Sequence, residues 1–186
     1  MEQRVNATPD ALMMVDEDMR TLTFAEFWAE AERAAAGLHS AGVRAGHVVS
    51  WQLPTWIESL VLAAALSRLG AIQNPISPAC RDSELAHMTS QVQAQVLVVP
   101  SMWKGFDYEQ MATELAQTDG SLRLLIAHGA LPQGDPAVLE PLAEVSVEDL
   151  PDPSWIFFTA GTEGQCKGVI HSDRSLIAAA RAVSLR

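Results

Sequence analysis

The chain has 186 residues, of which 48% are hydrophobic and 19% charged, enough for one domain with a buried core. Its formal net charge of −11, without any lysine or arginine cluster, argues against a nucleic-acid-binding surface. The N-terminus lacks the apolar core of a signal peptide, residues 57–69 are too short for a membrane span of roughly 20 residues, and two cysteines without metal-ligand or disulfide spacing favour a reducing cytoplasm.

The first predicted helix lies within residues 21–42. It opens with Thr23-Phe24-Ala25-Glu26, the pattern of a capping box, in which a hydroxyl and a carboxylate satisfy two backbone N–H groups. Apolar residues then recur every three or four positions, which predicts one buried face. Gly42 marks the end of this helix.

A strand and a second helix follow. Residues 48–53 are apolar and rich in β-branched side chains, which predicts a strand. Pro54 then leads into Thr55-Trp56-Ile57-Glu58, which we interpret as a second capping box at the start of an apolar core helix. Gly70 ends that helix.

The remaining elements continue the alternation of strands and helices. They are a strand at 71–76, a helix from Asp82 or Ser83 to about Gln93, a strand at 96–99, a helix at 108–117, a strand at 122–127 and a connection at 129–153, of which 131–153 reads as a surface loop. Because the strands are apolar runs, the sequence predicts an α/β fold. We expect a layered, mostly parallel sheet with helices on both faces, in one incomplete domain.

A glycine-rich segment, residues 159–168, lies between the strand 155–158 and the short apolar pair 169–170. Its glycines allow close backbone approach to a ligand, successive N–H groups in such turns form an anion nest, and its hydroxyls and lysine add a donor set and a cation. This chemistry suits a polyphosphate. The predicted phosphate-binding residues are Thr159, Gly161, Thr162, Glu163, Gly164 and Lys167.

Two better-known glycine motifs do not fit this segment. A Walker loop needs Ser or Thr after its lysine, whereas Gly168 follows Lys167, and a dinucleotide fingerprint needs a glycine pair at spacing two, whereas Gly161 and Gly164 are three apart. From composition alone, a glycine-rich hairpin turn with a solvated lysine remains an equal alternative to a phosphate site.

The segment resembles the first signature of the acyl-adenylate-forming superfamily, which is typically Tyr/Phe-Thr-Ser-Gly-Thr-Thr-Gly-x-Pro-Lys-Gly. Residues upstream are similar too, at Leu22-Thr23-Phe24, Leu53-Pro54, Arg68-Leu69-Gly70-Ala71 and Asn74-Pro75. The resemblance therefore covers nearly the whole chain. Within the superfamily, the chain looks most like acyl-CoA ligases for medium-chain or alicyclic carboxylates such as cyclohexanecarboxylate. The signature matches are Phe158, Thr159, Gly161, Thr162, Gly164, Lys167 and Gly168.

The resemblance implies an incomplete N-terminal AMP-binding domain, residues 1–186, that ends in a helix at 175–185 capped by Ser172 or Asp173, with the C-terminal domain absent. It implies ATP, Mg²⁺, coenzyme A and a small carboxylic acid as partners, and a role in cytoplasmic fatty acid metabolism. Lys167 and the loop would clamp the β- and γ-phosphates. No catalytic residue and no metal ligand is assignable, so we expect this part alone to be inactive. A homo-oligomer is compatible with the sequence.

Three residues depart from the signature. Ala160 removes a hydroxyl, Glu163 places a carboxylate beside a polyanion site, and Cys166 replaces a proline. Cys166 is interpreted as inert because only Lys167 and His171 are near it in the sequence as basic groups. Glu163 and Cys166 favour an alternative, a non-catalytic nucleotide-binding or interaction module. An unrelated phosphate-binding α/β protein is a third possibility. The other histidines, His39, His47, His87 and His128, are assigned no role.

Overall fold

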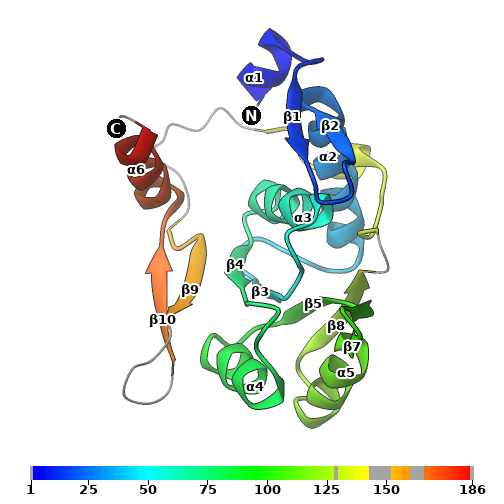
Figure 1. Ribbon diagram of the computed structural model, residues 1–186, viewed down its shortest axis with the longest axis vertical. Coiled ribbons are helices and arrows are strands. Elements are labelled where there is room, and N and C mark those ends of the chain that lie inside the picture. Colours follow the sequence, from blue (N-terminus) through cyan, green and yellow to red (C-terminus); the bar gives the residue numbers. More distant parts are fainter. Residues whose placement is uncertain (1, 128–129, 143–151, 160–165, 185–186) are drawn as a thin grey trace.

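The computed structural model describes residues 2–127, 130–142, 152–159 and 166–184 (Figure 1). Its centre is a six-stranded sheet with the order β10-β9-β4-β3-β5-β8. All neighbouring pairs are parallel except β9 and β10, so the predicted mostly parallel sheet is confirmed. The strands are β3 (Val48–Trp51), β4 (Ile72–Pro75), β5 (Val96–Pro100), β8 (Arg123–Ala127), β9 (Trp155–Thr159) and β10 (Lys167–His171).

Helices cover both faces of the sheet, as predicted. Every residue of strand β5 is buried, and its side chains alternate between two clusters of buried residues on opposite faces of the sheet. Val96 and Val98 belong to the cluster with α2 and α3, whereas Leu97 and Val99 belong to the cluster with α4 and α5. None of the described helices is both long and apolar enough to cross a bilayer. The helices are α1 (Glu2–Ala7), α2 (Phe24–Ser40), α3 (Ile57–Arg68), α4 (Asp82–Gln91), α5 (Tyr108–Thr118) and α6 (Asp173–Ser184), with a 3-10 turn η1 at Pro136–Val138.

Two small antiparallel sheets and helix α1 were missed by the sequence patterns. Strands β1 (Leu12–Val15) and β2 (Thr21–Thr23) pair beside α2, so residues 21–23 belong to a strand and the helix begins at Phe24. Strands β6 (Met102–Trp103) and β7 (Phe106–Asp107) form a hairpin between β5 and α5. With two to four residues each, these strands are too short to show a period of two.

The predicted capping box at the start of α2 is confirmed. The backbone N–H of Glu26 donates to Thr23 Oγ1 at 3.2 Å, and the backbone N–H of Thr23 donates to Glu26 Oε2 at 2.8 Å. The bond from the backbone N–H of Thr23 is the larger cause of the lowered pKa of Glu26, and an interaction with the Thr23 side chain lowers that pKa further. A carboxylate with a lowered pKa stabilises the fold above the pKa of the unfolded chain, and that contribution is lost as the pH falls through the folded value.

Replacing Thr23 by alanine is expected to lower the free energy of unfolding by about 1 kcal/mol at pH 7, because the N–H group of Glu26 loses its acceptor at a helix start. Urea unfolding followed by tryptophan fluorescence measures this change. Thr21→Ala is the control, since Thr21 is exposed on the same short strand and caps no helix. Equal losses in the two variants would contradict the capping role.

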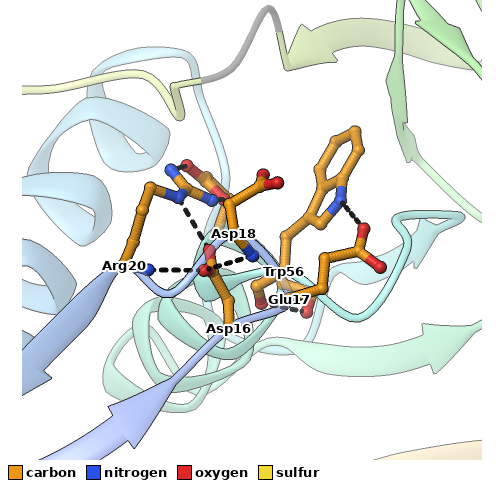
Figure 2. Close-up of polar contacts among 7 residues, drawn as sticks. Asp16, Glu17, Asp18, Arg20 and Trp56 are labelled. Atoms are coloured by element: carbon orange, nitrogen blue, oxygen red, sulfur yellow. Dashed lines mark hydrogen bonds and ion pairs between the residues drawn. The ribbon is translucent and has the colours of Figure 1, made fainter.

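The second predicted capping box is wrong. Helix α3 begins at Ile57, its N-cap is Trp56, and no side chain caps it. Glu58, which the box requires, instead accepts hydrogen bonds from Arg20 Nη1 at 2.7 Å and Nη2 at 3.0 Å. Arg20 also donates from Nε to Asp16 at 2.7 Å, and Figure 2 shows this network at the turn between β1 and β2. The ion pair with a distant arginine therefore replaces the local cap.

The predicted cap of α4 is also displaced. Arg81 occupies the N-cap position, so Asp82 and Ser83 lie in the first turn of the helix. The carboxylate of Glu84 accepts from the backbone N–H of Arg81 at 3.2 Å. The negative charges of Asp82 and Glu84 lie where the positive end of the helix dipole favours them.

The connection after β8 is not only a surface loop. In its described part, residues 130–142, Leu131 is buried in the core against α2 and α3. The backbone N–H of Gly134 donates to the carbonyl of Arg33 on α2 at 2.9 Å. Most of residues 130–142 are exposed, as the predicted surface loop requires, but residues 132–134 also pack directly on the backbone of α2.

Candidate functional site

The β9–β10 hairpin holds both ends of the glycine-rich segment. Strand, loop and strand follow one another as predicted, and the two strands extend further into the segment than the sequence indicated, to Thr159 on one side and from Lys167 on the other. These two residues are partners in the antiparallel register. The hairpin lies at one edge of the sheet (Figure 1).

Thr159 and Lys167 are the two predicted phosphate-binding residues that the structure describes. Thr159 Oγ1 donates to the backbone carbonyl of Lys167 at 3.5 Å, and both residues are exposed. Within the described parts of the chain, the ammonium of Lys167 forms no ion pair with a carboxylate. A hydroxyl and an exposed ammonium therefore lie at the two paired ends of the segment, a donor set that suits an anion.

The other predicted phosphate-binding residues lie outside the described residues, as does Ala160. Their contribution to a phosphate site therefore stays a prediction. These residues are Gly161, Thr162, Glu163 and Gly164.

His87 on α4 contacts the end of the glycine-rich segment, a contact that the sequence did not indicate. Its Nε2 atom lies 3.3 Å from the backbone carbonyl oxygen of Cys166, the residue before Lys167. The two residues are 79 positions apart in the chain. No short motif surrounds His87, so only the packing of α4 beside the hairpin reveals the pair.

The two cysteines are free and half-buried; Cys80 lies just before α4, and Cys166 directly precedes β10. Both pack against the cluster of buried residues beneath α4 and α5. Burial raises the pKa of the Cys80 thiol, and the nearby Glu84 and Cys166 raise it further. A raised pKa favours the protonated thiol over the nucleophilic thiolate.

The run His171-Ser172-Asp173 contains the residue types of a hydrolase triad without its geometry. Asp173 accepts a hydrogen bond from Trp155 Nε1 at 2.7 Å, so its carboxylate does not orient the histidine. Ser172 Oγ accepts from the backbone N–H of Ser175 at 3.2 Å, which confirms the predicted capping role of Ser172 at α6.

Two cavities of about 350 Å³ each lie elsewhere in the fold, and neither includes Thr159 or Lys167. One lies beside the Arg20–Glu58 ion pair, and its lining includes the apolar side chains of Leu22, Ile57 and Val61. The other lies between the loop after β4 and the β6–β7 hairpin, and is lined by Arg81, Lys104 and aromatic side chains. In the described residues, no group of three or more His, Cys, Asp or Glu side chains has the arrangement of a metal site.

The chain matches the family model described as AMP-binding enzyme over residues 1–186. It is 33% identical over 194 residues to a salicyl-AMP ligase / salicyl-S-ArCP synthetase of Mycobacterium tuberculosis, which covers 96% of this chain and 34% of the relative. It is 26% identical over 196 residues to the medium-chain fatty-acid–CoA ligase of Escherichia coli, over 100% of this chain and 34% of the relative. The chain thus spans about a third of the length of these relatives.

The fold is similar to that of solved adenylate-forming enzymes. O-succinylbenzoate coenzyme A synthetase from Bacillus subtilis, in complex with AMP, superposes with a TM-score of 0.74 at 21% identity. The superposition covers 99% of this chain and 44% of that one. At this identity the likeness shows the shared α/β fold alone.

Proposed function

The chain belongs to the AMP-binding enzyme family, and on that premise we propose that it is the N-terminal part of an ATP-dependent acyl-CoA ligase. One observation carries the proposal at the level of residues. The hydroxyl of Thr159 and the ammonium of Lys167 lie at the paired ends of the glycine-rich segment, exposed and without a carboxylate partner among the described residues. An anion such as the triphosphate of ATP fits these groups.

The proposed reaction has two steps. A carboxylate oxygen attacks the α-phosphorus of ATP, which forms acyl-AMP and releases pyrophosphate; a thiol then attacks the acyl carbon and releases AMP. Lys167 would hold the β- and γ-phosphates and offset the charge that develops on the leaving pyrophosphate. Thr159 would help to hold the backbone of Lys167 through its hydrogen bond to the Lys167 carbonyl. Positioning and charge neutralisation, rather than a covalent intermediate with the protein, would supply most of the rate.

The cosubstrates follow from the family and its named relatives. The medium-chain fatty-acid–CoA ligase supports coenzyme A as the acyl acceptor and a small carboxylic acid as the substrate. The salicyl-AMP ligase supports an aryl acid as a further candidate. Mg²⁺, when bound with the nucleotide, would supply additional charge neutralisation. The acyl pocket and the C-terminal domain are proposed to lie in the two thirds of such enzymes that this chain does not span.

Carboxylate-dependent exchange between ATP and pyrophosphate tests the first step. The full-length gene product is expected to incorporate labelled pyrophosphate into ATP with at least one acid from a panel of medium-chain fatty acids, cyclohexanecarboxylate and salicylate. The 186-residue chain alone is expected to give no exchange with any acid. Exchange by the short chain would contradict the proposal that it is incomplete.

The same exchange assay distinguishes the ligase from the alternative function, a non-catalytic nucleotide-binding module. Cys166 stands where the family signature has proline, which is the described departure that favours a non-catalytic nucleotide-binding module. If the full-length gene product binds ATP but catalyses no exchange with any acid of the panel, it acts as such a module. Formation of acyl-CoA from an acid that supports exchange, detected by mass spectrometry, would instead support the ligase.

A further inference from the structure

The peptide bond between Cys166 and Lys167 is held by a side chain from another layer of the fold. Its carbonyl oxygen lies 3.3 Å from Nε2 of His87. The next carbonyl, that of Lys167, accepts from Thr159 Oγ1 at 3.5 Å. The backbone of Lys167 is therefore tied on its N-terminal side to α4 and on its C-terminal side to β9.

His87 is the donor in its hydrogen bond to the Cys166 carbonyl. A carbonyl oxygen accepts hydrogen bonds and cannot donate them, so Nε2 of His87 must carry the proton. The contact thus specifies one orientation of the imidazole toward the hairpin.

Helix α4, which carries His87, is held in place by buried side chains. Leu85 and Met88, its neighbours on α4, are buried in the core beneath α4 and α5. The segment that leads into α4 is also fixed, because the fully buried Gln52 donates from Nε2 to the carbonyls of Ser77 at 2.8 Å and Cys80 at 3.0 Å. A side chain on such a platform can set the position of a neighbouring backbone.

We propose that His87 is a positioning residue for the phosphate clamp: its hydrogen bond to the Cys166 carbonyl fixes the backbone from which the Lys167 side chain reaches the ATP phosphates. This inference rests on the proposed function, since it assigns Lys167 to the phosphates. His87 would act through the Cys166 carbonyl and not by direct contact with the nucleotide. Because the hydrogen bond already orders the backbone of Lys167 in the free protein, less conformational entropy is lost when ATP binds.

Two substitutions at one position test the proposal. His87→Gln keeps an N–H donor the same number of bonds from Cα, whereas His87→Leu keeps a side chain of helix-compatible shape without a donor. Binding of ATP with Mg²⁺ to the full-length gene product is measured by titration calorimetry, and the melting temperature is measured for each protein. His87→Leu is expected to raise the Kd for ATP about fivefold, the effect of one lost hydrogen bond, and His87→Gln to stay within about twofold of the original.

The exchange assay adds a readout that a purely structural role would not move. His87→Leu is expected to raise the KM for ATP and leave the KM for the carboxylate unchanged, with a melting temperature equal to that of His87→Gln. Equal ATP affinity in all three proteins, or equal losses in both variants, would overturn the positioning role. If the original protein binds ATP but gives no exchange, the ligase proposal fails, while the Kd comparison still decides the role of His87. Absence of ATP binding in the original protein would overturn both.

Discussion

Replacing Lys167 by glutamine is expected to lower kcat/KM for ATP in the exchange reaction about 100-fold. The loss is of the size seen when one donor that stabilises developing negative charge is removed from an enzyme. Lys167 is exposed and free of carboxylate partners in the described residues, so its charge is available to a ligand and its removal leaves no buried group unpaired. The free energy of unfolding should therefore change little.

Lys104 provides a matched control, because the chain contains only two lysines. It lies at the turn between β6 and β7, where its ammonium lies 4.5 Å from the centroid of the Trp103 ring. Lys104→Gln removes the same charge from the same net total and is expected to leave exchange within about twofold, because screening at physiological salt acts over about 8 Å. Comparable losses in the two variants would show a general charge effect and contradict a specific phosphate clamp.

Replacing Gly37 by alanine is expected to destabilise the protein by about 1 to 3 kcal/mol, the usual cost of overpacking. In an ordinary helix interior, replacing glycine by alanine raises the free energy of unfolding by about 1 kcal/mol. The sign of the measured change therefore shows whether another segment packs closely against Gly37. On α2, however, a Cβ at Gly37 would overlap the backbone of Pro132 and Gln133. The opposite side of the contact is also close, since a Cβ at Gly134 would lie 2.7 Å from the carbonyl carbon of Ala36.

Urea unfolding measures this change, with Gly120→Ala as the control. A Cβ at Gly120 would meet no atom within 4 Å. The control is expected to change the free energy of unfolding by less than about 0.5 kcal/mol, as for most surface substitutions. An unchanged or raised stability in Gly37→Ala would show that residues 132–134 do not pack on α2 as described.

Much of the fold could be predicted because its signals are local. The capping box at Thr23 and Glu26 depends on residues three positions apart, and the apolar strands β3 and β5 are short runs with turn residues on either side. At the start of α3, a local signal failed because of a distant residue. Glu58 would have served a cap at Thr55, but Arg20, 38 positions away, binds both of its carboxylate oxygens.

The candidate site shows the same division. Glycine content, hydroxyls and one lysine predicted a phosphate site at residues 159–168, and the structure brings Thr159 and Lys167 together as register partners. The sequence did not reveal His87, because a histidine alone carries no spacing signal and its partner is a backbone carbonyl. Backbone acceptors exist at every residue, so no pattern of residue types identifies such a pair.

The sequence by itself determined the alternation of strands and helices, the mostly parallel sheet and the position of the glycine-rich segment, because backbone hydrogen bonds and hydrophobic periodicity act over a few residues. Only the tertiary structure decided which groups meet across the layers: Arg20 with Glu58, the 132–134 segment with α2, and His87 with the peptide bond before Lys167. These contacts join residues far apart in the chain. Their geometry depends on how helices pack on the sheet, which a one-dimensional pattern does not contain.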